Sequence, residues 1–131
     1  MKLTIPFYLH KVGAGFPSPA TDYIEDDLDL NTHLISNAPA TFIIRVQGKS
    51  MRDVGIYDGD LLIVDKSISP KSFSTVIANV NEELVVKTFI KEKEISYLTS
   101  GSKSTIDKIN LGENQEVIIW GVVTYVIHKL Q

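Results

Sequence analysis

The sequence has no cysteine among its 131 residues. Disulfide bonds, thiolate nucleophiles and zinc sites with cysteine ligands are therefore excluded. The absence of disulfides is compatible with a cytoplasmic location. We expect no cofactor and no metal site, because the acid-rich segment 22–29 lacks the glycine and the spacing of a calcium loop. We interpret this segment as a solvated face.

The chain also lacks an excess of positive charge. Its 13 lysines and arginines are outnumbered by 16 aspartates and glutamates, which gives a formal net charge of −3. Sequence-independent binding to DNA depends on neutralising phosphates with clustered basic side chains. We therefore expect no direct, sequence-independent binding to DNA, and we expect any contact with nucleic acid to be made through another protein.

Long hydrophobic runs are missing as well. No stretch approaches the roughly 20 apolar residues that span a bilayer. Val12-Gly13-Ala14 has the small residues of a secretory cleavage site, but the apolar run before it, residues 3–9, is short and contains Pro6. A secretory signal needs a longer apolar core than this. We expect neither a membrane anchor nor secretion.

Prolines and glycines gather at the N-terminus, where they break up regular structure. Pro6, Pro17 and Pro19 accompany Gly13 and Gly15, so neither a helix nor a central strand can persist there. We expect residues 1–20 to form a flexible, extended arm and residues 21–131 to form one β-rich domain. At the start of that domain, we expect Asp29 to cap one or two helical turns that reach Ile35.

After Pro39 the chain consists of short runs rich in β-branched and aromatic residues. Turn signals such as Asp58-Gly59 and Asn79-Val80-Asn81-Glu82 separate the runs. No long segment with helical periodicity lies between them. The pattern predicts a mostly β fold whose largely antiparallel sheet curls or closes. The expected strands cover residues 41–46, 61–64, 75–78, 84–90 and 117–127.

Ser50 and Lys87 are the candidate catalytic residues of this β-rich region. A serine hydroxyl becomes a good nucleophile when a nearby base takes its proton, and lysine is the base in the Ser–Lys variants of the catalytic triad. The histidines are weaker candidates, because His10 falls in the arm, His33 in a polar helical turn and His128 near the C-terminus. We expect all three histidines at the surface.

The strand around Lys87 favours a base at this position. A lysine accepts a proton only after losing its own, and burial among apolar groups promotes that loss. Residues two apart on a strand share a face, so Lys87 lies between Val85 and Phe89. The pattern also permits an ordinary lysine that extends its charged head into water.

The segment before Ser50 permits a sharp turn at Gly48. A serine at such a turn can expose its hydroxyl while backbone N–H groups point at a developing oxyanion. The alternative is an ordinary turn serine, a common residue in turns.

Several segments resemble one known family. Gly48-Lys49-Ser50-Met51 and the following residues 53–65 are similar to the nucleophile segment of the LexA-type self-cleaving Ser–Lys peptidases, and Val85-Val86-Lys87 resembles the segment bearing that family's lysine. Ala14-Gly15 resembles the scissile bond. The sequence Gly-Phe-Pro-Ser-Pro-Ala at residues 15–20 is similar to the segment after the cut in UmuD-like mutagenesis proteins, and residues 120–123 resemble the family's closing strand.

The chain departs from the family pattern in two places. Its arm before Gly15 is short, and Thr99-Ser100-Gly101-Ser102 stands where relatives often carry a Pro-Asn turn. We expect only local loop differences at that turn. The arm has no room for a DNA-binding helix-turn-helix before Ala14, so a repressor is not expected.

The resemblance implies a LexA-type peptidase fold and a serine peptidase with a Ser50–Lys87 dyad. It further implies an oxyanion hole made by the backbone N–H groups of Ser50 and Met51, and cleavage of the chain's own bond between Ala14 and Gly15. The implied setting is the SOS response: RecA filaments on single-stranded DNA stimulate the cut, the protein forms a homodimer, and the trimmed chain joins a UmuC-type Y-family polymerase in error-prone translesion synthesis. Two alternatives stay open: a LexA- or signal-peptidase-like protease acting on other proteins, and a non-cleaving β-rich polymerase accessory module.

Overall fold

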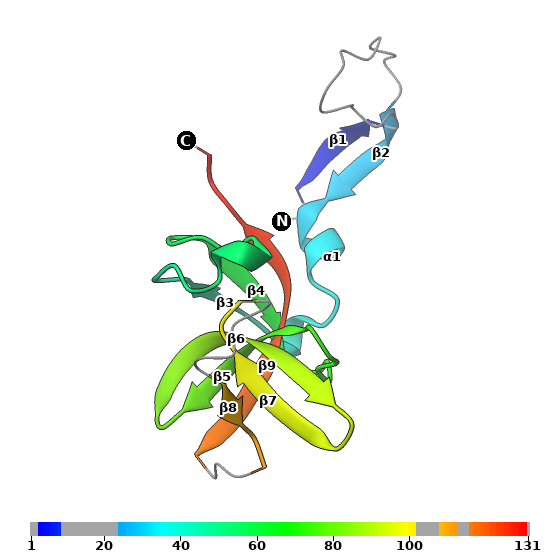
Figure 1. Ribbon diagram of the computed structural model, residues 1–131. Coiled ribbons are helices and arrows are strands. Elements are labelled where there is room, and N and C mark those ends of the chain that lie inside the picture. The colour runs from blue at the N-terminus through cyan, green and yellow to red at the C-terminus, as the bar shows by residue number, and fades with distance from the viewer. Residues whose placement is uncertain (1–2, 9–23, 102–107, 113–115, 131) are drawn as a thin grey trace. The chain divides into compact units, whose positions relative to one another are not determined.

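The computed structural model describes residues 3–8, 24–101, 108–112 and 116–130 (Figure 1). The chain divides into two compact units, residues 1–36 and 37–131. Within the described ranges, none of the helices is both long enough and apolar enough to cross a membrane.

The first unit contains a two-stranded sheet and a short helix. Strand β1 (Thr4–Tyr8) pairs antiparallel with β2 (Ile24–Asp29), with Ile5 opposite Leu28 and Phe7 opposite Asp26. Part of the N-terminal segment is thus a strand that pairs with the acid-rich segment. Pro6 is accommodated because each strand of a two-stranded sheet has an unpaired edge.

Helix α1 (Leu30–Leu34) follows β2 directly. The Asp29 carboxylate accepts hydrogen bonds from the Asn31 backbone N–H at 3.1 Å and from the Thr32 hydroxyl at 2.9 Å. A side-chain oxygen at this position satisfies a donor that the helix itself leaves without a partner. The predicted helical turn with its Asp29 cap is confirmed.

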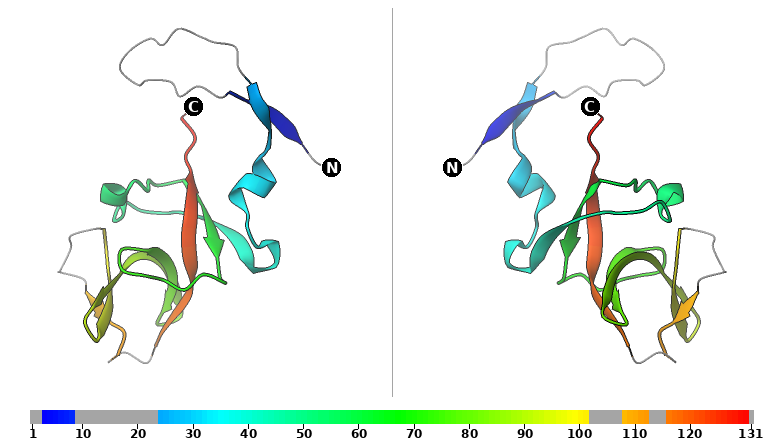
Figure 2. Two further views of the ribbon diagram at one scale, coloured as in Figure 1. Left: turned by 90° about the vertical axis from the view of Figure 1, so that its right-hand side faces the viewer. Right: turned by 90° about the vertical axis from the view of Figure 1, so that its left-hand side faces the viewer.

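The second unit is built on a seven-stranded sheet with the order β3-β4-β9-β5-β6-β7-β8, and all its neighbouring strands are antiparallel. Figures 1 and 2 show this sheet strongly curved. The predicted mostly antiparallel β fold is confirmed, and β7 and β8 are additional to the expected strands. The bounds are β3 Thr41–Arg45, β4 Leu61–Asp65, β5 Thr75–Val80, β6 Glu83–Glu92, β7 Ile95–Thr99, β8 Ile109–Asn110 and β9 Val117–Ile127. Two 3₁₀ turns, η1 (Ala38–Ala40) and η2 (Arg52–Val54), flank β3.

The β5–β6 hairpin determines where Lys87 lies. Its two-residue turn, Asn81-Glu82, has positive φ angles of 51° and 68°, as in the turns whose twist matches that of a hairpin. This turn sets Val80 opposite Glu83 and therefore Val76 opposite Lys87. The turn predicted at residues 79–82 is thus present at 81–82.

The core of the second unit consists of two apolar clusters on the sheet. One contains Val76, Ala78, Phe89, Leu98 and Val122. The other contains Val46, Met51, Ile56, Leu62, Val64 and Ile77. Because Met51 belongs to the second cluster, the residue next to Ser50 is anchored in the core.

Candidate active site

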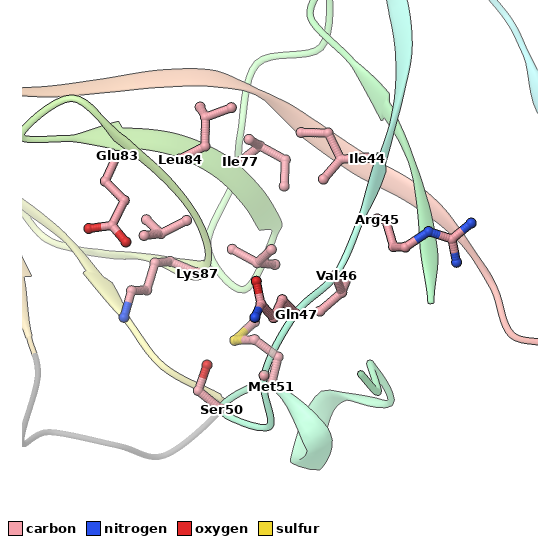
Figure 3. A pocket seen from close by; sticks show the side chains of 13 residues that line it. Ile44, Arg45, Val46, Gln47, Ser50, Met51, Ile77, Glu83, Leu84 and Lys87 are labelled. Atoms are coloured by element: carbon pink, nitrogen blue, oxygen red, sulfur yellow. The ribbon is translucent and has the colours of Figure 1, made fainter. Parts of the chain in front are cut away.

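A cavity of about 650 Å³ lies between the β5–β6 hairpin and the chain that leaves β3. Both predicted catalytic residues, Ser50 and Lys87, line it. Figure 3 shows the ends of these two side chains near one another at one side of the cavity, Ser50 from the turn after β3 and Lys87 from β6. The other lining residues are Ile44, Arg45, Val46, Gln47, Gly48, Met51, Ile77, Glu83, Leu84, Val85 and Val86.

The turn that carries Ser50 is held at its base by backbone hydrogen bonds. The Val46 N–H donates to the Asp60 carbonyl oxygen, and the Gly59 N–H donates to the Val46 carbonyl oxygen, both at 2.8 Å. The Gly48 N–H donates to the Asp58 carboxylate at 2.8 Å. Gly48 has a φ of 109°, a backbone conformation that disfavours any other residue. Ser50 is exposed at the top of this fixed turn.

Met51 connects the turn to the apolar core. Its side chain is buried, and its carbonyl oxygen accepts hydrogen bonds from the Val54 and Ile56 N–H groups, both at 3.2 Å. Met51 is also the N-cap residue of η2, so Ser50 and Met51 stand where the chain enters a helical turn.

Lys87 is half-buried on β6, between the half-buried Val85 and the buried Phe89. Its Nζ donates a hydrogen bond to the Ser100 hydroxyl oxygen at 2.8 Å. Ser100 is itself buried, with 9% of its surface exposed. The end of the Lys87 side chain is therefore bonded inside the protein and does not extend freely into water.

Ser100 and Gly101 are site residues that the sequence did not reveal. We expected only local loop differences from relatives at residues 99–102, and this stays a prediction. The turn contacts both Lys87 and the segment that carries Ser50. Ser100 bonds Lys87, and the Gly101 N–H donates to the Met51 sulfur at 3.1 Å. In the sequence, the signal that could have pointed to this turn is a serine followed by a glycine, and Gly101 does adopt a positive φ of 68°.

A buried carboxylate supports the turn from the side of β9. One Asp60 oxygen accepts a hydrogen bond from the Tyr57 N–H at 2.8 Å, and the other lies 2.5 Å from Nδ1 of His128. The bond to His128, followed by the bond from Tyr57, lowers the pKa of Asp60 below its ordinary value. His128 is exposed, as predicted, and it also connects the residues just after β9 to Asp60.

Ala14 and Gly15, the predicted cleavage site, lie outside the described residues, between β1 and β2 in the chain. His10, in the predicted arm, also lies outside them, and His33 is exposed. Among the residues that the structure describes, no group of three or more His, Asp or Glu side chains could hold a metal ion.

Known proteins are similar to this chain over nearly its whole length. Residues 6–124 match the family described as Peptidase S24-like. Protein ImpA of Salmonella typhimurium is 42% identical over 124 residues, which cover 95% of this chain and 83% of that protein. Protein MucA of Escherichia coli is 38% identical over 122 residues, covering 93% and 83%. The LexA repressor of Colwellia psychrerythraea is 35% identical over 120 residues, covering 91% and 56%.

Proposed function

Because this chain belongs to the Peptidase S24-like family, we propose that Ser50 and Lys87 cut the chain's own bond between Ala14 and Gly15. The chain is a self-cleaving serine peptidase of the type that acts in SOS mutagenesis. The observation that carries the residue assignment is that Ser50 and Lys87, from separate elements, line one end of one cavity.

The chemistry begins with proton transfer. Neutral Lys87 takes the proton of the Ser50 hydroxyl as Oγ attacks the carbonyl carbon of Ala14. The backbone N–H groups of Ser50 and Met51 donate to the oxyanion that forms. The bond to Gly15 then breaks, Lys87 gives its proton to the leaving amine, and Ala14 remains attached to Ser50 as an ester. Water, deprotonated by Lys87, attacks the ester, the bond from the Ala14 carbonyl carbon to Ser50 Oγ breaks, and Lys87 returns its proton to that oxygen as the Ala14 carboxyl group is released.

The substrate is part of the same chain, which makes up for weak recognition. Reacting groups that are linked and well oriented reach effective molarities of 10⁵ M or more. We propose that residues 1–20 act as the arm that presents Ala14 and Gly15, and that residues 21–131 form the peptidase domain. A chain cut in this way carries out the reaction once, so the cut works as a switch.

We also propose the partners of the switch. RecA filaments on single-stranded DNA stimulate the cut, and the trimmed chain from Gly15 to Gln131 forms a homodimer that joins a UmuC-type Y-family polymerase in the cytoplasm. The family resemblance supports these partners, and the net charge of −3 favours contact with other proteins over direct binding to DNA.

The experiment is to incubate the purified full chain between pH 7 and pH 10 and follow its mass. We expect a slow product that starts at Gly15, formed faster at higher pH because only a neutral lysine accepts the proton. Ser50→Ala and Lys87→Ala should abolish the product. Lys91→Ala is the matched control, because Lys91 is an exposed lysine on the same strand, β6.

Two results would overturn this assignment. One is a wild-type chain that stays intact at pH 10 and also in the presence of RecA filaments. The other is cutting that continues unchanged in both the Ser50→Ala and the Lys87→Ala variants.

A further inference from the structure

The residue after β7 supplies a hydroxyl that has no role in the proposed proton transfer. Strand β7 ends at Thr99, and Ser100 follows it directly. In the antiparallel pairing of β6 with β7, Thr88 lies opposite Thr99. The residue before Thr88, Lys87, is therefore brought opposite the residue after Thr99, Ser100. Side chains at directly opposed positions share a face and interact, which accounts for the 2.8 Å hydrogen bond from Lys87 Nζ to Ser100 Oγ.

The same turn is also fixed against the segment that carries Ser50. The Gly101 N–H bonds the Met51 sulfur at 3.1 Å. A side chain at Gly101 would stand 2.7 Å from an oxygen of the Asp53 carboxylate, so the turn and the segment are in close contact. Ser100 is thus held between the lysine and the nucleophile segment, and its position relative to both is set by the backbone around it.

We infer that Ser100 is a positioning residue that orients Lys87 toward Ser50, an inference that rests on the proposed function. A lysine amine sits on a flexible four-carbon stem and can rotate freely about its last bond. The neutral amine has two N–H donors and one lone pair, and only the lone pair accepts the Ser50 proton. A hydrogen bond from one N–H to Ser100 Oγ limits the rotation, so that the lone pair is available on the side facing Ser50. Ser100 acts on the reaction through Lys87, by holding its Nζ.

The test compares Ser100 variants in the full chain. Ser100→Ala should lower the first-order rate of self-cleavage by about 10- to 100-fold, the range expected when a reacting group is misplaced by about 1 Å. Ser100→Thr keeps a hydroxyl and should restore most of the rate, whereas Ser100→Val has the shape of threonine without the hydroxyl and should not. This pair separates the hydrogen bond from packing even if Ser100→Ala folds poorly.

The control is Thr88→Val, because the buried Thr88 hydroxyl has no hydrogen-bond partner within the described structure. This change also removes a hydroxyl beside Lys87 on β6, and it should keep the rate of self-cleavage. A rate that falls in Ser100→Val, returns in Ser100→Thr and stays unchanged in Thr88→Val is a result that packing alone would not give.

The outcomes separate this inference from the proposed function. If the wild type cuts itself, Ser50→Ala does not, and Ser100→Val cuts within twofold of Ser100→Thr, the positioning role is wrong and the dyad stands. If the wild-type chain never cuts itself, both are overturned.

Discussion

At the residue scale, the carboxylate of Asp60 holds the turn that presents Ser50. Asp60 is buried, with 2% of its surface exposed, and its backbone and side chain together bond Val46, Tyr57 and His128. A buried carboxylate is costly unless it is paired and hydrogen-bonded. The depressed pKa of Asp60 shows that these partners favour its charged form.

This pairing predicts a pH-dependent stability. A carboxyl group whose pKa is lower in the folded than in the unfolded chain adds stability above its unfolded pKa, near 3.8, and that stability is lost as the pH falls through the folded pKa. Asp60→Asn keeps the shape but removes the charge. We expect the wild type to have the higher Tm between pH 5 and pH 7, and we expect the gap to shrink steadily below about pH 3.8.

Replacing His128 should weaken the pH-dependent stabilisation by Asp60, since the bond to His128 is the main cause of the lowered pKa of Asp60. The difference in Tm between the wild type and His128→Gln should therefore also narrow on acidification. Tm measured across the pH range for the three proteins checks this. A gap between wild type and Asp60→Asn that stayed constant down to pH 3 would contradict the role given to Asp60.

The two dyad candidates could be predicted from local sequence, and Ser100 could not. The strand pattern and the turn glycine make Lys87 and Ser50 candidates, and the resemblance of their segments to the LexA-type peptidases singles them out, because both signals lie in neighbouring residues. The contact of Ser100 with Lys87 depends on the register between β6 and β7. That register is a property of two paired strands, and β7 was not among the strands that the sequence predicted.

At the scale of elements, the β5–β6 hairpin is what delivers Lys87 to the cavity. Both residues of its turn, Asn81 and Glu82, have positive φ angles. Asparagine tolerates this conformation better than most residues, but glutamate does not share that tolerance. A two-residue hairpin turn of this kind favours glycine at the second position. Glu82 therefore adds strain to a turn that the site needs.

Glu82→Gly should stabilise the protein. Relief of the left-handed conformation is worth about 1–2 kcal/mol, and the extra freedom of glycine in the unfolded chain costs about 0.4–1 kcal/mol. We expect a net gain of about 0.5–1 kcal/mol in the free energy of unfolding, measured with urea. The adjacent Glu83→Gly is the matched control: it lies on β6, where glycine should destabilise by about 0.5–1 kcal/mol. Equal effects of the two changes would show that the turn conformation does not matter.

The strands that were predicted and those that were missed differ in their pattern. The runs in β3, β4, β5 and β9 are dense in β-branched and aromatic residues, so their sequence alone identifies them. Strand β7, Ile-Ser-Tyr-Leu-Thr, is short and follows the charged residues 91–94, of which 93 and 94 form the turn after β6, and β8 has only two residues. Their pairing with β6 and with one another makes them strands.

At the scale of the whole molecule, the proposed cut separates two strands that pair. The five residues of β1 precede Ala14 in the chain, and β2 follows Gly15. Before the cut, β1 and β2 are joined by residues 9–23. After it, they belong to different molecules. A two-stranded sheet is marginally stable even when its strands are linked.

The loss of the linkage should release β1. A short connection keeps its two ends at an effective concentration in the millimolar range. At micromolar protein, the association of β1 with β2 is therefore about a thousandfold weaker after the cut, a difference of about 4 kcal/mol. We expect the fragment 1–14 to dissociate and the amides of β2 to exchange hydrogen faster. The measurement is hydrogen exchange of residues 24–29 in the Ser50→Ala chain and in a chain that begins at Gly15, so the comparison does not depend on self-cleavage. The β3–β4 pair serves as the internal reference, because both its strands lie in the second unit and on the same side of the cut in the chain. Equal protection of β2 in both chains would mean that β1 is not what protects this edge, and that the switch leaves the structure around β2 unchanged.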